Sequence, residues 1–120
     1  MKTHKDLDIW GKGLDLVTDI YKLTKNFPKE EIYGLSSQMQ RAAVSYPSNI
    51  AEGAARNSKP DYIRFIYIAL SSLSELETQV IISKNLGYTS DNEKLLNEIE
   101  ILRKMTLNFI KHLKGERNSR

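Results

Sequence analysis

The sequence predicts an all-α fold, an up-down-up-down bundle of four antiparallel helices. Apolar residues recur at steps of three and four along four segments, which is the period of amphipathic helices. Proline and glycine separate these segments and leave only short connections, so consecutive helices should run in opposite directions. The β-branched run Val80-Ile81-Ile82 would suit a strand, but it is short and lies inside a strong helical period.

The first helix is expected from about Leu7 to Thr24. Its apolar residues recur at helical steps and predict the face that packs inward: Leu7, Trp10, Leu14, Val17 and Tyr21. The helix ends shortly before Pro28, because the residue that precedes a proline is pushed out of helical geometry.

The second helix is expected to begin near Lys29 or Glu30, where acidic residues meet the positive end of the helix dipole. Its predicted inward face is Ile32, Leu35, Met39, Ala42, Tyr46 and Ile50. Pro47 lies in its interior and removes a backbone donor, so we expect a kink there. The helix then stops at Gly53.

The third helix is expected from about Pro60 to Leu86, with Ser58 or Lys59 near its cap and Gly87 as its C-terminal stop. Its inner seam is predicted as Tyr62, Phe65, Ala69, Leu73, Leu76, Val80 and Ser83. The segment 89–93 offers a cap with an acidic first turn for the fourth helix. The inner face of that helix is predicted as Leu95, Ile99, Leu102, Thr106, Phe109 and Leu113.

Length and composition indicate a single domain over residues 1–120, with a core at about 7–113 and a basic C-terminal tail at 114–120. Hydrophobic residues make up 40% and charged residues 28%, which is typical of a globular protein. The absence of cysteine excludes disulfides, thiolate metal sites and a cysteine nucleophile. The N-terminus lacks an apolar signal core, and no apolar run approaches the ~20 residues of a membrane span. We therefore expect a cytoplasmic protein with no membrane partner.

The chain lacks the side chains that catalysis in a helical bundle usually needs. Di-metal carboxylate bundles require Glu-x-x-His pairs on two helices, but the only histidines are His4 and His112. No histidine is available on the same segments as a base for the serines, and there is no glycine-rich phosphate loop. Arg103 and His112 are too far apart along one helix to converge on a phosphate. We expect no catalytic residues, no metal and no cofactor, and an enzyme acting on RNA is the least favoured alternative.

Polar residues form a narrow stripe on the second helix where a plain helix would be apolar, and a matching line lies on the third. The two sets are Gln38, Arg41, Ser45, Asn49 and Glu52 on the second helix, and Ser72, Glu75 and Gln79 on the third. In one interpretation these are half-exposed, solvated flank positions. In the other, Glu75 pairs with Arg41 or Asn49 in a partly buried network that fixes helix register or assembly, because buried polar groups persist mainly where they specify an arrangement.

Several motifs spread over the chain form a recognisable combination. They are Trp10-Gly-Lys-Gly-Leu14, Phe27-Pro-Lys-Glu-Glu-Ile-Tyr-Gly-Leu35, Ser37-Gln-Met-Gln-Arg-Ala-Ala-Val-Ser-Tyr-Pro-Ser-Asn-Ile-Ala-Glu-Gly53 and Ser71-Ser-Leu-Ser-Glu-Leu-Glu-Thr-Gln79. In this combination the chain resembles the bacterial four-helix bundle proteins named for the 23S rRNA intervening sequence, from Leu7 to about Leu113. Tyr46 departs from the pattern, because that family usually has an aliphatic residue before the proline. We interpret Tyr46 as a core or subunit-interface residue.

The resemblance implies more than the residues do by themselves. The intervening-sequence family is similar in fold to the accessory proteins of diversity-generating retroelements, which assemble as barrel-shaped pentamers and bind a reverse transcriptase and nucleic acid. It therefore implies a left-handed bundle, a homopentamer and binding of RNA or DNA. It implies no known reaction, and the net charge of +3 is lower than is usual for the retroelement proteins.

We expect a non-enzymatic bundle that associates with itself and binds RNA or another nucleic acid through basic residues. The expected contacts are Arg56, Lys59, Arg103, Lys104, Lys111, Lys114 and Arg117. Such contacts hold phosphates without reading sequence. The alternative is a protein–protein adaptor with no nucleic-acid role. In that case the basic residues near the C-terminus belong to a solvated last helical turn and a frayed tail.

Overall fold

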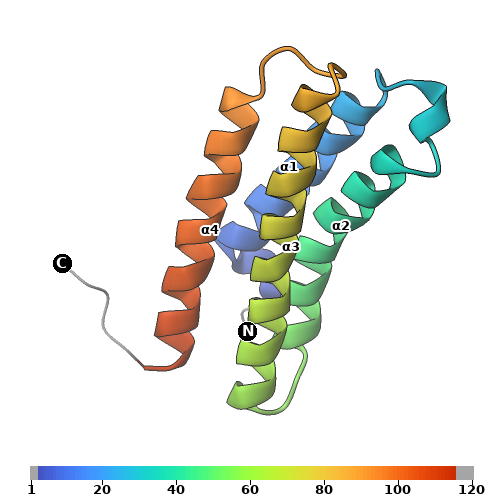
Figure 1. Cartoon of the computed structure of the whole chain (residues 1–120). Coiled ribbons are helices and arrows are strands. Elements are labelled where there is room, and N and C mark those ends of the chain that lie inside the picture. Colours follow the sequence, from blue (N-terminus) through green and yellow to red (C-terminus); the bar gives the residue numbers. More distant parts are fainter. Residues whose placement is uncertain (1–2, 116–120) are drawn as a thin grey trace.

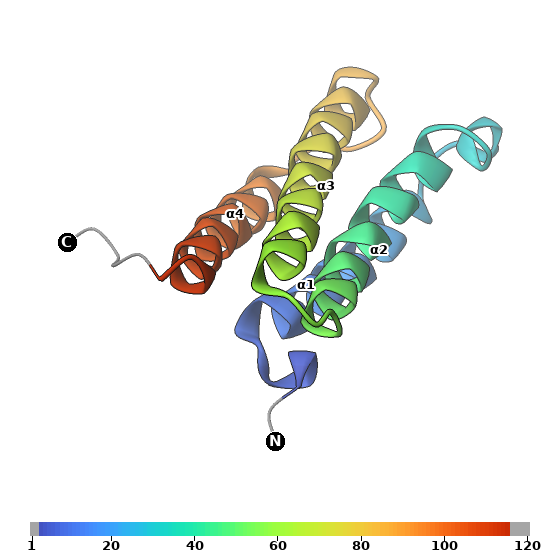
Figure 2. The same cartoon turned by 90° about the horizontal axis from the view of Figure 1, so that it is seen from below.

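The computed structural model describes residues 3–115, and its architecture confirms the predicted all-α class. Four α-helices account for most of these residues: α1 Asp8–Thr24, α2 Leu35–Ala54, α3 Lys59–Asn85 and α4 Glu93–Leu113. Two short 3₁₀ helices, η1 His4–Asp6 and η2 Lys29–Glu31, precede α1 and α2. Successive helices alternate in direction (Figure 1). Each helix packs on the next, and α4 returns to α1, so the four form a closed ring around one core, seen from below in Figure 2.

The core is one continuous cluster to which every helix contributes. Its fully buried side chains include Ile20 of α1, Met39 and Ile50 of α2, Leu73 of α3 and Ile99 of α4. The predicted apolar line of α2 from Met39 to Ile50 is buried. The predicted seam of α3 is buried from Ala69 to Ser83, and its first two positions are half-buried.

Tyr46 connects two helices that face each other diagonally across the core. It is fully buried, and its hydroxyl lies 2.7 Å from Thr106 Oγ1 on α4. Thr106 uses its only proton to donate to the Leu102 carbonyl at 2.7 Å, so Tyr46 must be the donor of the pair. Burial raises the pKa of Tyr46 to about 12, although the hydrogen bond with Thr106 acts in the opposite direction. The hydroxyl that we expected at a core or subunit interface is therefore satisfied inside this chain.

Glycine allows the helices to approach closely at two places. A Cβ added to Gly13 of α1 would lie 2.8 Å from Tyr46 Cδ2, so the tyrosine ring fills the space that a side chain would need. A Cβ added to Gly53 of α2 would lie 2.9 Å from Phe65 Cβ on α3. These contacts set how α1 and α3 pack on either side of α2.

The fully buried stripe of α1 lies one position from the predicted inward face, of which Leu7, Trp10 and Val17 still pack against the core. Leu14 and Tyr21 are 41% and 47% exposed, whereas the neighbouring stripe of Ile9, Leu16 and Ile20 is buried. The cause is Gly13, which belongs to the buried stripe. An apolar pattern does not count glycine, but the ring of Tyr46 can pack only where α1 carries no side chain.

The start of α2 also differs from the prediction, because the chain forms η2 first and begins the α-helix only at Leu35. Ile32 therefore lies outside the core and is 56% exposed. Glu31 organises this junction: its carboxylate accepts the Leu35 N–H at 3.0 Å and the Tyr88 hydroxyl at 2.7 Å. These two hydrogen bonds lower the pKa of Glu31 below its ordinary value of 4.5.

Pro47 does not break α2, which continues through it and past the expected stop at Gly53 to Ala54.

The ends of α3 follow the predicted signals. Ser58 accepts the Asp61 N–H at 3.2 Å as its N-cap, and Gly87 takes a positive φ of 79° just beyond its C-terminus. At α4 the cap residue Asn92 instead donates to the Val80 carbonyl of α3 at 3.2 Å, so it joins two helices rather than closing one.

Within residues 3–115, α3 alone is long and apolar enough to cross a membrane by length and composition. This differs from the sequence-based expectation, in which no uninterrupted apolar run is long enough to span a membrane. The inner face of α3 lies in the core, where it packs against α2 and α4. Core packing accounts for part of its apolar composition, since 39% of the apolar stretch is buried, while Ile68, Ile81 and Ile82 remain exposed.

Substitution of Gly13 by alanine is expected to destabilise the protein by about 1–3 kcal/mol, because the new methyl group overlaps the Tyr46 ring. Gly11 lies two residues away on the same helix and has nothing within 4 Å of an added Cβ. Gly11→Ala is the matched control and should stabilise by roughly 0.5–1 kcal/mol through helix propensity alone. Urea unfolding of both variants measures the contrast, and equal effects would contradict this account of the α1–α2 contact.

Thr106→Val should cost more stability than Tyr46→Phe, although both remove the same hydrogen bond. The valine variant leaves a buried tyrosine hydroxyl without a partner, which costs roughly 1–3 kcal/mol, whereas the phenylalanine variant loses about 1 kcal/mol. Urea unfolding of the two variants measures the difference.

The elevated pKa of Tyr46 also predicts that the stability of the fold depends on pH in the alkaline range. The stability that it implies is fully present below pH 10 and is lost as the pH rises toward about 12. Chemical unfolding of Tyr46→Phe at several alkaline pH values should therefore show a flatter decline than the unchanged protein.

Candidate nucleic-acid interface

Two arginines converge on one aromatic ring at the end of the bundle where α2 gives way to α3. The guanidinium carbon of Arg56, which follows α2, lies 4.7 Å from the centre of the Phe65 ring, and that of Arg64 on α3 lies 4.6 Å from it. Both distances fall in the range of cation–π contacts. Arg56 pairs with Glu52 at 3.1 Å, and Arg64 pairs with Asp61 at 3.2 Å.

A third cation meets a ring on the opposite flank of α3. Lys114, directly after α4, lies with its Nζ 5.3 Å from the Tyr67 ring centre and donates to the Tyr67 hydroxyl at 3.0 Å. Lys59 is exposed at the first residue of α3, and Lys111 is half-buried on the last turn of α4. We call Arg56, Lys59, Arg64, Lys111 and Lys114, with their two aromatic partners, the basic end of the bundle.

The remaining predicted contacts do not belong to this end. Arg103 lies about two and a half to three turns back along α4 and is hydrogen-bonded to Glu100, whose carboxylate raises the pKa of the guanidinium. Glu77 of α3 adds a further negative charge near it. Lys104 is exposed next to it along the helix. Arg117 lies outside the described residues. The predicted set is therefore divided between the basic end and an acid-flanked stretch of α4.

The polar seam between α2 and α3 contains one contact between helices among the predicted residues. Ser45 Oγ of α2 lies 2.9 Å from Ser72 Oγ of α3. Asn49 donates to the carbonyl and hydroxyl oxygens of Ser45 at 2.8 and 2.9 Å, so it supports the serine from within α2. The buried amide of Gln79 donates weakly to Glu75 one turn away, and its Oε1 has no partner among residues 3–115.

The expected pairing of Glu75 with Arg41 or Asn49 is not formed within residues 3–115. Asn49 is already bonded inside its own helix, and Glu75 contacts Gln79 of its own helix. Gln38 and Arg41 are exposed, and Glu52 pairs with Arg56 at the basic end. The seam thus combines both interpretations: Ser45 and Ser72 bridge the helices and Gln79 is buried, whereas the remaining charged and amide side chains at its other positions are exposed or half-exposed.

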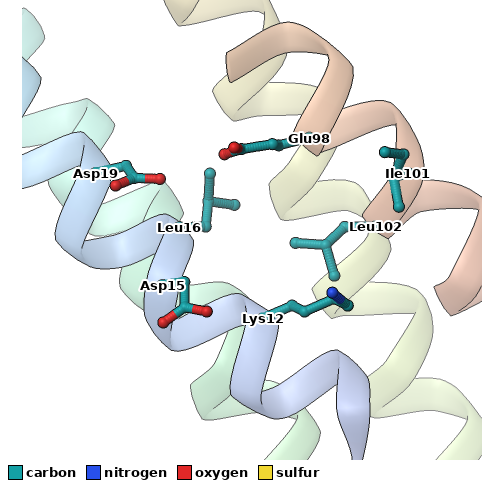
Figure 3. A pocket seen from close by; sticks show the side chains of 7 residues that line it. All are labelled: Lys12, Asp15, Leu16, Asp19, Glu98, Ile101 and Leu102. Carbon is teal, nitrogen blue, oxygen red and sulfur yellow. The ribbon is translucent and has the colours of Figure 1, made fainter. Parts of the chain in front are cut away.

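A cleft of about 340 Å³ between α1 and α4 escaped the sequence analysis. Its floor is apolar, from Leu16 and Leu102, and charged side chains stand around it, namely Lys12, Asp15, Asp19 and Glu98 (Figure 3). The signal in the sequence was the spacing of the α1 residues, which share one helix face at steps of three and four. No group of three or more metal-ligating side chains occurs within residues 3–115. The two histidines pack against rings, His4 on Trp10 and His112 on Phe109.

Sequence reasoning also missed Arg64 and Tyr67 as members of the basic end. The available signal was the alternation of basic and aromatic residues in the first two turns of α3. We assigned Phe65 to the core seam alone, but it is half-buried and two guanidinium groups lie over its ring.

The fold and the basic end define a class of small helical bundles with clustered surface cations. The chain belongs to the 23S rRNA-intervening sequence protein family, which it matches over residues 5–108. A similar solved structure is the 1.70 Å crystal structure of a protein with unknown function from the S23 ribosomal protein family of Bacteroides thetaiotaomicron VPI-5482. That protein is 25% identical, with a TM-score of 0.76, and the match covers 86% of this chain and 98% of that chain. No curated protein matches this chain.

Proposed function

We propose that the protein is a non-enzymatic module that binds the phosphate backbone of a structured RNA through its basic end. The observation that carries this proposal is the convergence of cations from α2, α3 and α4 at one end, each of three held against an aromatic ring. Clustered Lys and Arg side chains bind phosphates by releasing counterions. The names of the family and of its structural relative both refer to the ribosome or its RNA, which agrees with an RNA partner.

We infer further that copies of the chain associate through the α2–α3 face. The seam on this face is flanked by exposed apolar side chains, Val44 at 40%, Ile68 at 36% and Ile82 at 40%. It also contains the unpartnered buried oxygen of Gln79. The likeness to retroelement accessory proteins that we drew from the sequence suggests a homopentamer.

The alternative function is a protein–protein adaptor with no nucleic-acid role. It is favoured by the exposed apolar residues near the C-terminal end of α3, Ile81 at 45%, Ile82 at 40% and Leu86 at 54%. A partner protein could cover these residues at the end of the bundle opposite the basic end.

Fluorescence anisotropy with a labelled ribosomal RNA hairpin tests the proposed function. Affinity should fall steeply with salt, and the double variant Lys59→Gln, Lys114→Gln should reduce the steepness of log K against log salt by about 1.4–1.8, for two lost phosphate contacts. The matched control is Lys84→Gln, Lys94→Gln, which removes two exposed lysines at the other end of the bundle and should leave the slope unchanged. No binding at low salt would contradict the proposal and favour the adaptor function.

Light scattering during size-exclusion chromatography tests self-association. The unchanged protein should run as an oligomer at micromolar concentration, and Ile68→Gln should shift it toward the monomer because it places a polar group on the proposed interface. Ile101→Gln is the control, since Ile101 is similarly exposed, at 46%, but lies at the α1–α4 cleft. A monomeric unchanged protein, or equal effects of the two variants, would contradict the assignment of the α2–α3 face.

A further inference from the structure

The cluster of Arg56, Phe65 and Arg64 has a geometry that phosphate binding alone does not require. Arg56 lies in the connection after α2, and Arg64 lies on α3. Their guanidinium carbons come to 4.7 and 4.6 Å from the centre of the same ring. A lysine can bind a phosphate as a point charge, whereas an arginine also offers a planar group that stacks on aromatic faces. Here the two cations are planar guanidinium groups, and each lies against the Phe65 ring.

Each guanidinium group also pairs with a nearby carboxylate. Glu52 holds Arg56 and Asp61 holds Arg64, each from within one helical turn. The arginine side chains nevertheless remain 42% and 57% exposed. Ion pairs with this exposure add little to stability. They favour one placement of the two flat cationic groups and leave both groups where a ligand can reach them.

A flat, delocalised cation beside an aromatic ring is a stacking surface for a nucleobase. Bases that are unpaired in loops and bulges stack on aromatic rings and on arginine planes, whereas those of a continuous A-form duplex are already stacked on each other. The neighbouring Lys59 is exposed at the start of α3 and can reach the phosphates that flank such a base. The tight approach of Gly53 to Phe65 Cβ brings the base of this side chain close to the last turn of α2.

We propose that the cluster of Arg56, Phe65 and Arg64 binds an unpaired nucleobase, so that the protein prefers RNA with a single-stranded loop or bulge over continuous duplex. This inference rests on the proposed RNA-binding function and names the feature of the RNA that the basic end recognises. The bound segment is held by stacking and charge, with no requirement for a particular base, because every base has a stacking face.

Two hairpins with the same stem and the same number of phosphates test the inference. One has an ordinary loop, and in the other the loop sugars carry no bases. The unchanged protein should bind the ordinary hairpin about tenfold or more tightly, which is the scale of one stacked base. The double variant Arg56→Lys, Arg64→Lys keeps both charges but loses both planes. Its preference for the ordinary hairpin should fall several-fold, although Phe65 remains, with an unchanged salt dependence.

The control is Arg103→Lys, which makes the same change at an arginine paired with Glu100 away from the basic end and should keep the preference. Circular dichroism melting checks that every variant remains folded. Equal binding of the two hairpins by the unchanged protein would overturn the inference and leave the phosphate-binding function standing. A double lysine variant that keeps the preference would overturn the assignment to this cluster. Failure to bind either hairpin at low salt would instead refute the proposed function itself.

Discussion

The packing of this bundle depends on the burial of one tyrosine across the centre of its core. The ring of Tyr46 occupies the space that a side chain at Gly13 would need, so α1 must turn its glycine inward. Its hydroxyl can be buried because Thr106 accepts its hydrogen bond, since an unpaired hydroxyl in the core would cost roughly 1–3 kcal/mol. One residue of α2 thus determines the rotation of α1 and ties α4 to the opposite side of the core.

The same helix positions the basic end through its second close approach. Gly53 allows α3 to pack so tightly on the last turn of α2 that the chain leaving α2 and the chain entering α3 share one surface. Phe65 lies on that surface with Arg56 and Arg64 against it. The clustering of cations is therefore a consequence of how two helices meet, and it depends on the core in a way that a patch of isolated surface lysines would not.

The four helices could be predicted from the sequence, but some of the contacts between them could not. The seam of α3 could be predicted because it repeats over many turns, and Ser58 and Gly87 mark its ends by local chemistry. The inward face of α1 could be predicted only in part, because two apolar stripes lie side by side and the choice between them depends on a tyrosine in another helix. The pairing of Arg103 with Glu100 was visible as a spacing of three residues, but its significance depends on Glu77, which only the fold brings near.

The distribution of charge matters more for this protein than its modest total of +3. At Arg103, the charges of Glu100 and Glu77 offset those of Arg103 and Lys104, so an approaching phosphate would meet no net positive charge. At the basic end, each arginine has one exposed carboxylate partner, and the positive end of the α3 dipole and the charge of Lys59 lie beside them. Exposed ion pairs are weak enough for a phosphate to replace the carboxylate at small cost. A mildly basic chain can therefore present one strongly attractive site, provided that its carboxylates are concentrated elsewhere, as they are along the α1–α4 cleft.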